Sequence, residues 1–151
     1  MKLATTTSDF SRFTDNAKDA VRLCREAGFT NVDYSFGEDF DRGNGCFSPD
    51  WRAYLADLKQ YAAGLGVTFV QAHAPMGTPI VRDAQYEPFI EANRRCIEAC
   101  GILGIPNIVI LICGPGSPIS TTQEETSITS RTHSAVCLPA VCMQNIKPRA
   151  K

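Results

Sequence analysis

The sequence predicts an α/β fold with parallel strands, and two observations indicate it. The first is a repeat: Gly28, Gly66 and Gly104 lie 38 residues apart, and each glycine ends an amphipathic helical stretch and precedes an apolar strand. A helix-glycine-strand unit that recurs at a fixed period is a β/α repeat. The second is the stretch between Gly66 and Pro75, whose β-branched, aromatic and small residues are typical of a parallel strand covered on both faces.

Periodicity and capping residues predict the other elements. We expect four strands, at residues 3–7, 31–36, 67–74 and 107–112. We expect three helices, at residues 15–27, 49–65 and 86–103. The first helix should begin after an N-cap at Thr14, and the second after Ser48, with Pro49 at its first position. Residues 37–45 form a glycine-rich acidic segment, which we predict to be a loop, either functional or simply solvated.

The repeat stops at about residue 113. The residues that follow are β-branched and hydroxyl-rich without an apolar stripe, and no glycine stands where the next repeat would end. We therefore divide the chain into an ordered part, residues 1–112, and an irregular, poorly ordered tail, residues 113–151. A frameshift or truncation would explain why period and composition change at one place, whereas an authentic small domain would have to cover its sheet edges in another way.

Composition narrows the class of protein. The chain has 151 residues, of which 44% are hydrophobic and 21% charged, which is enough for one domain with a sizeable core. The formal net charge of −1 gives no electrostatic reason to expect nucleic acid or an anionic membrane as a partner. No apolar run reaches the length of a membrane span, and the first residues lack the apolar core of a signal peptide, so we expect a cytoplasmic protein.

The cysteines are predicted to be reduced and structural. The chain has 7 cysteines, and Cys24, Cys96 and Cys100 fall on the apolar faces of predicted helices. Free cysteine in such a position behaves as a small hydrophobe. Cys96 and Cys100 are one helical turn apart, which also suits a metal, but no further ligands follow at the usual spacing.

Three polar residues near strand ends are the candidate site. Val67, Phe69, Gln71 and His73 share one parity of the third strand, so we expect both polar side chains to leave the same face. Asp33 should point away from the helices on the second strand. Polar groups at the carboxyl ends of parallel strands are typical of ligand sites. The alternative is that these side chains only satisfy nearby backbone or loop groups.

Four segments together resemble the first half of a xylose isomerase-like TIM barrel. They are residues 3–7, 27–33, 66–75 and 103–110, and the third contains Gln71-Ala72-His73-Ala74-Pro75. This superfamily includes sugar and sugar-phosphate isomerases and epimerases and the endonuclease IV branch. The resemblance covers about residues 1–110 and implies a partial (β/α)8 barrel with about four parallel strands and three helices. A complete barrel takes about 250 residues, so this chain is too short to close one.

The resemblance also implies a function and its limits. In the isomerases, a divalent metal is held by Glu, Asp, His and Glu at the ends of strands five to eight, which this chain does not contain. The strand-three position of His73 usually lines the substrate pocket, and in the endonuclease IV branch a histidine there binds zinc. Relatives often have a second histidine at the end of strand four, where this chain has Leu111, Ile112 and Cys113.

The resemblance therefore implies a fragment of a metal-dependent sugar or sugar-phosphate isomerase or epimerase that is itself inactive. Asp33, Gln71 and His73 would line the sugar site, with no catalytic residue present and no metal bound by this chain. The alternative is a small non-catalytic α/β module that binds a ligand, a partner or a second copy of itself through an open sheet edge.

Overall fold

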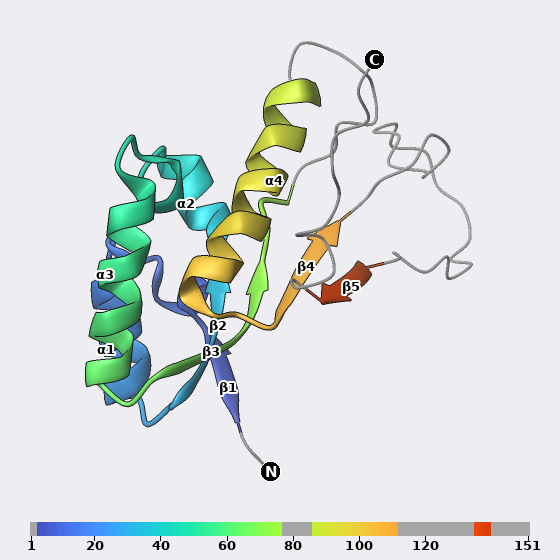
Figure 1. Cartoon of the computed structure of the whole chain (residues 1–151). Helices are drawn as coiled ribbons and strands as arrows, with labels where there is room; N and C mark the ends of the chain where they lie inside the picture. Colours follow the sequence, from blue (N-terminus) through green and yellow to red (C-terminus); the bar gives the residue numbers. More distant parts are fainter. Residues whose placement is uncertain (1–2, 77–85, 112–134, 140–151) are drawn as a thin grey trace, which may run out of the picture.

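The computed structural model describes residues 3–76, 86–111 and 135–139 (Figure 1). The strands are β1 (Ala4–Thr6), β2 (Asn31–Ser35), β3 (Thr68–His73), β4 (Asn107–Leu111) and β5 (Ala135–Pro139). The helices are α1 (Ala17–Glu26), α2 (Phe36–Arg42), α3 (Trp51–Gly64) and α4 (Tyr86–Leu103), with two 3₁₀ turns, η1 (Thr7–Phe10) and η2 (Gly45–Phe47). The predicted α/β class is confirmed.

The sheet follows the order of the sequence. Its strand order is β1-β2-β3-β4-β5, and the first four strands are parallel. Because right-handed crossovers that always step in the same direction keep their helices on one face, this order predicts a single helical layer. Consistent with this, α1 packs beside α3 and α3 packs beside α4 (Figure 1). This is the arrangement of successive units of a β/α barrel rather than of a doubly wound sheet.

The core lies between the strands and this helical layer. Val32 and Tyr34 alternate along β2 with partly exposed residues, which is the pattern of a strand with one apolar face. The Tyr34 ring makes edge contacts with Phe36 and Phe69, at centroid distances of 4.8 and 5.5 Å. Leu55 and Leu58 of α3 are fully buried against the same cluster.

A fifth strand lies within the segment for which the sequence predicts no element. Ala135–Pro139 pairs antiparallel with β4, with Asn107 opposite Pro139 and Leu111 opposite Ala135. The rest of the predicted tail lies outside the described residues. Within the described sheet, β5 therefore occupies the outer edge of β4, and β1 forms the other edge.

The first helix begins later than predicted. The N-cap of α1 is Asn16, whose side chain accepts a hydrogen bond from the Lys18 backbone N–H at 2.8 Å. Thr14 instead accepts a hydrogen bond from the Asn16 N–H at 3.1 Å, so it stabilises the turn before the helix. Both residues have the chemistry of a cap, and the sequence alone favoured the wrong one.

The start of α3 also differs from the prediction. Ser48 is not the N-cap, because its hydroxyl donates to the Gly45 carbonyl at 2.8 Å and closes η2. Asp50 takes the N-cap position, and the helix begins at Trp51. For the helix predicted at residues 86–103, which is α4, the predicted end is confirmed at Leu103.

The predicted loop at residues 37–45 is in large part a helix. α2 spans Phe36–Arg42, with Phe36 and Asp39 buried on its inner side. Gly43 ends it with a left-handed φ of 63°, as a C-terminal cap glycine does. A helix of seven residues is too short to be recognised by periodicity, and it is stabilised by the burial of Phe36 and by the hydrogen bonds of Asp39.

The predicted parity of the third strand is wrong in one respect. The register changes between the pairs Val32–Phe69 and Asp33–Gln71, so Val70 is an extra residue in β3. This β-bulge places Phe69 on the buried helical face and Gln71 on the opposite face. His73 is aligned with Ser35, on the same face as Gln71, as expected.

The cysteines on the helices are free thiols within the core, as predicted. Cys24, Cys96 and Cys100 are free and fully buried, as is Cys46 on η2. Burial raises the pKa of the Cys24 thiol to about 11 and that of Cys100 to about 12, which disfavours the reactive thiolate. Across the part of the chain that the structure describes, every helix is too short or too polar to cross a bilayer.

Candidate functional site

The three predicted site residues come together at the carboxyl ends of β2 and β3. Asp33 and Gln71 are aligned across the two strands, and His73 follows two residues later on β3. All three lie on the sheet face opposite the core residues Val32 and Tyr34. We call this side of β2 and β3 the polar face. The bulge at Val70 positions the cluster, because it rotates Gln71 and His73 onto the same face as Asp33.

The cluster is held by two hydrogen bonds to one carboxylate. Gln71 Nε2 donates to Asp33 Oδ2 at 2.7 Å, and His73 Nδ1 lies 3.0 Å from the Asp33 carboxylate. The Asp33 side chain is 13% exposed, whereas His73 is 38% exposed. Asp33 therefore forms the base of the cluster, and the imidazole is the group that a ligand can reach most easily.

The bond to Asp33 fixes which ring nitrogen of His73 carries a proton. An ionised carboxylate only accepts hydrogen bonds, so Nδ1 must be the donor. In the neutral ring, Nε2 is then the acceptor that remains for a ligand. The Gln71 amide uses its nitrogen on Asp33, which leaves its carbonyl oxygen as a second acceptor. Hydroxyl groups of a polar ligand are suitable donors to both atoms.

The cluster does not by itself fit a metal ion. Among the described residues there is no group of three or more His, Cys, Asp or Glu side chains placed to hold one. Asp33 and His73 supply two such side chains, and they bond to each other. A divalent metal at this position would need ligands from elsewhere, so we derive no step of chemistry through a metal.

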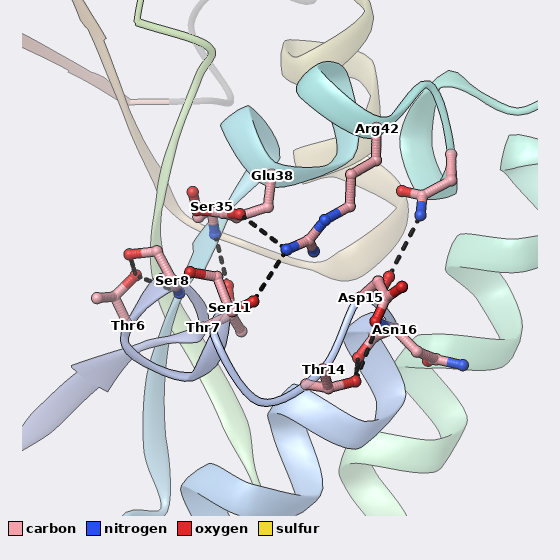
Figure 2. Close-up of polar contacts among 11 residues, drawn as sticks. Thr6, Thr7, Ser8, Ser11, Thr14, Asp15, Asn16, Ser35, Glu38 and Arg42 are labelled. Carbon is pink, nitrogen blue, oxygen red and sulfur yellow. Dashed lines mark hydrogen bonds and ion pairs between the residues drawn. The ribbon is translucent and has the colours of Figure 1, made fainter.

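A second polar site lies beside the first and was missed by the sequence analysis. It is a pocket at the carboxyl ends of β1 and β2, between η1, α1 and α2. Figure 2 shows its polar contacts: Thr7 accepts a hydrogen bond from the Ser35 N–H at 2.9 Å, and Arg42 reaches from α2 toward η1. The Arg42 guanidinium donates to the Ser11 carbonyl at 3.1 Å and pairs with Glu38 at 3.4 Å.

Asp39 is the buried carboxylate of this pocket. Its Oδ2 accepts hydrogen bonds from the Tyr34 hydroxyl at 2.8 Å and from the Cys46 N–H at 3.0 Å. Desolvation raises the pKa of the Asp39 carboxyl to about 6, and the two hydrogen bonds and Arg42 oppose this only in part. Asp39 thereby joins α2 to β2 and η2. In the sequence it appears only as one acidic residue among several in a predicted loop.

Gly45 allows the close approach to Asp39. Its φ of 50° is left-handed, and a Cβ atom at this position would lie 2.5 Å from the Asp39 carboxylate. The missing side chain of Gly45 leaves room for the Asp39 carboxylate next to the Cys46 N–H, but in the sequence nothing distinguishes Gly45 from Gly43.

Comparisons with known proteins add little to this geometry. No protein-family model matches the sequence, and no curated protein matches it. The crystal structure of protein SMc04130 from Sinorhizobium meliloti 1021 is similar, with a TM-score of 0.48 and 19% sequence identity. The match covers 78% of this chain and 39% of that protein, so this chain spans well under half of its length.

Proposed function

We propose that this chain corresponds to the amino-terminal half of a metal-dependent sugar or sugar-phosphate isomerase or epimerase, and that by itself it does not catalyse the reaction. The observation that carries the proposal is the Asp33–Gln71–His73 cluster at the carboxyl ends of β2 and β3. Ligand sites of β/α barrels lie at this end of the strands. The sequential strand order and the segments that resemble the xylose isomerase-like barrels support the same assignment.

The chemistry of the cluster suits one wall of a sugar site. The His73 ring and the Gln71 carbonyl oxygen offer acceptors for sugar hydroxyls, and Asp33 acts as a positioning residue that holds both side chains. In the intact relatives that the resemblance implies, the divalent metal would polarise the oxygens of the sugar next to the proton that is removed. The metal ligands and the glutamate base would come from strands that this chain lacks.

Histidine NMR provides a sharp test, because the chain has 2 histidines, His73 and His133. We expect long-range ¹H–¹⁵N spectra to show His73 as the Nδ1–H tautomer in its neutral form. Titration with D-fructose or D-fructose 6-phosphate should shift the Nε2 signal of His73 and leave that of His133 unchanged. Gln71→Ala should weaken the response. Asn31→Ala, on the same face at the other end of β2, is the matched control and should not.

Three results would count against the proposal. If neither sugar moves the His73 signals, or if both histidines respond equally, the cluster is not a sugar site. Turnover of a sugar by the purified chain with Mg²⁺, Mn²⁺ or Zn²⁺ would contradict the claim that it is inactive alone, because the resemblance places the base and the metal ligands outside it.

The alternative function, a non-catalytic module that binds through an open sheet edge, has a candidate edge at β1 in the described sheet, and the shortness of that strand speaks against it. Within the described sheet, β1 is an edge strand whose one partner is β2, whereas β4 is paired on both sides. β1 has three residues, and short edge strands generally discourage pairing with another chain. Size-exclusion chromatography at increasing concentration separates the two proposals. A dimer that Leu3→Lys disrupts would favour the module, since Leu3 precedes β1 and is 63% exposed.

A further inference from the structure

The polar face of β2 and β3 continues onto the strands beside them. The register aligns Thr6 of β1 with Asp33, and Val109 of β4 with His73. Around the Asp33–Gln71–His73 cluster, the other polar residues of this face are Thr6, Asn31, Ser35, Thr68 and Asn107. When the His73 ring is neutral, the Asp33 carboxylate is therefore the one formal charge that the described strands β1 to β4 place on this face.

The lysines and arginines lie elsewhere. Within the described parts of the chain, each of them belongs to α1, α2, α3 or α4, with the exception of Arg12, which follows η1. α1, α3 and α4 pack on the opposite, buried face of the sheet (Figure 1). Arg42 of α2 reaches toward η1, but its guanidinium is bonded to the Ser11 carbonyl and paired with Glu38 (Figure 2). A phosphate on the polar face would meet the charge of Asp33 without a cation from these residues to offset it.

The hydrogen-bonding atoms of the cluster also favour a neutral ligand. Asp33 already accepts from Gln71 Nε2 and is bonded to His73 Nδ1. The groups that remain on Gln71 and His73 are two acceptors, the Gln71 carbonyl oxygen and His73 Nε2, and one donor, the second amide hydrogen of Gln71. Sugar hydroxyls both donate and accept, whereas a phosphate dianion only accepts and needs several donors or cations. The cluster therefore fits hydroxyl groups and lacks the donors for a phosphate.

We propose that the cluster binds a neutral, unphosphorylated sugar, whose hydroxyl groups donate to His73 Nε2 and to the Gln71 carbonyl oxygen. This inference rests on the proposed function and narrows its substrate class from sugars and sugar phosphates to sugars without a phosphate. Val109 lies beside His73 in the register and gives the site an apolar neighbour for the C–H groups of the sugar. A ligand that carries phosphate is disfavoured twice, by the charge of Asp33 and by the shortage of donors.

The dissociation constants of D-fructose and of its 1- and 6-phosphates test this inference. They are measured with the full chain at pH 8 and at one ionic strength, from the shift of the His73 Nε2 signal. We expect both phosphates to bind at least about threefold more weakly than D-fructose, because Asp33 repels the dianion. Raising the salt concentration from about 0.01 M to about 1 M should narrow this gap, since salt screens the repulsion, and should leave the affinity for D-fructose unchanged.

A cation added to the polar face should reduce the preference for the neutral sugar. Val109→Lys places an ammonium group on the strand beside His73, so we expect it to strengthen the binding of both phosphates at least about threefold. Val109→Met has a long side chain without the charge and is the matched control, which should keep the wild-type ratio of affinities. Should Val109→Lys not fold, the salt dependence of the wild-type protein carries the test.

Two results would overturn the inference and leave the proposed function standing. Binding of either phosphate as tightly as D-fructose, or more tightly, would identify sugar phosphates as the ligand class. A gap that neither salt nor Val109→Lys changes would show that the charge of the face does not select the ligand. If none of the three compounds shifts the His73 signals, the proposed function itself fails, and this inference fails with it.

Discussion

Single residues decide where the two polar sites lie. Asp33, Gln71 and His73 could be predicted because polar residues at strand ends of a β/α repeat carry a positional meaning. The bulge at Val70 could not, since an extra residue in a strand leaves no mark on an apolar run. Asp39 could not be predicted either, because its burial depends on Tyr34 and Cys46, which come from other elements.

Asp39 should make stability depend on pH. Burial raises the pKa of its carboxyl from 3.8 to about 6, so the folded protein binds this proton more tightly than the unfolded chain does. The contribution of Asp39 to stability is therefore full below pH 4, falls as the pH rises from 4 to 6, and is constant above. The loss is on the order of 3 kcal/mol.

Urea unfolding between pH 4 and pH 8 measures this loss. Asp39→Asn should flatten the curve over that range, because the amide does not titrate. Asp41→Asn should leave the slope intact, since Asp41 is exposed. An unchanged slope in Asp39→Asn would assign the pH dependence to another group.

Gly45 should tolerate substitution far less well than Gly43. Both have left-handed φ angles, of 50° and 63°, so alanine costs about 1 kcal/mol of backbone strain at either position. At Gly43 the added Cβ meets nothing within 4 Å, whereas at Gly45 it lies 2.5 Å from the Asp39 carboxylate. We expect Gly45→Ala to destabilise the fold by about 2 kcal/mol more than Gly43→Ala in urea unfolding. Equal costs would mean that the carboxylate moves aside freely.

At the scale of elements, long periodic segments were predictable and short ones were not. α4 shows a clear apolar stripe over 18 residues, and its predicted bounds are confirmed. α2 has seven residues and contains Gly37, so its stability comes from the burial of Phe36 and the hydrogen bonds of Asp39 rather than from its own periodicity. Helix starts were uncertain where two capping residues stand close together, as at Thr14 and Asn16.

The start of α1 gives a test of this assignment. Asn16→Ala should destabilise the protein by about 1 kcal/mol, because the Lys18 N–H loses its side-chain acceptor. Asn16→Asp keeps an acceptor at the same position and should restore most of the stability. Chemical denaturation of the three proteins provides the measurement. If the aspartate variant is as unstable as the alanine variant, the cap bond is not what Asn16 contributes.

At the scale of the whole molecule, the order of the parallel strands follows from the order of the sequence. The strand at one edge of the described sheet, β5, could not be predicted in this way. Consecutive β/α units place each new strand beside the last one, which is why four parallel strands could be predicted from a repeat. The pairing of Ala135–Pro139 with β4 joins residues far apart in the chain, and local pattern carries no signal for it.

The contiguous core predicts that the described fold unfolds as one unit. Its buried residues run from Val21 of α1 through α3 and α4 to Ile110 of β4 without a break between layers. Trp51 is the one tryptophan of the chain and is 6% exposed, so its fluorescence reports on this core, while far-ultraviolet circular dichroism reports on the helices. We expect the two signals to change together in urea, as in a cooperative transition.

Leu58→Ala tests how much one buried side chain of this core contributes to the free energy of unfolding. Leu58 is fully buried between α3 and the sheet, so its truncation should cost about 2–5 kcal/mol and move both signals by the same amount. Leu3→Ala is the matched control: this leucine is 63% exposed and should cost less than about 0.5 kcal/mol. If Leu58→Ala shifts the fluorescence transition but not the dichroism transition, α3 separates from the remaining helices, and the helical layer is not one cooperative unit.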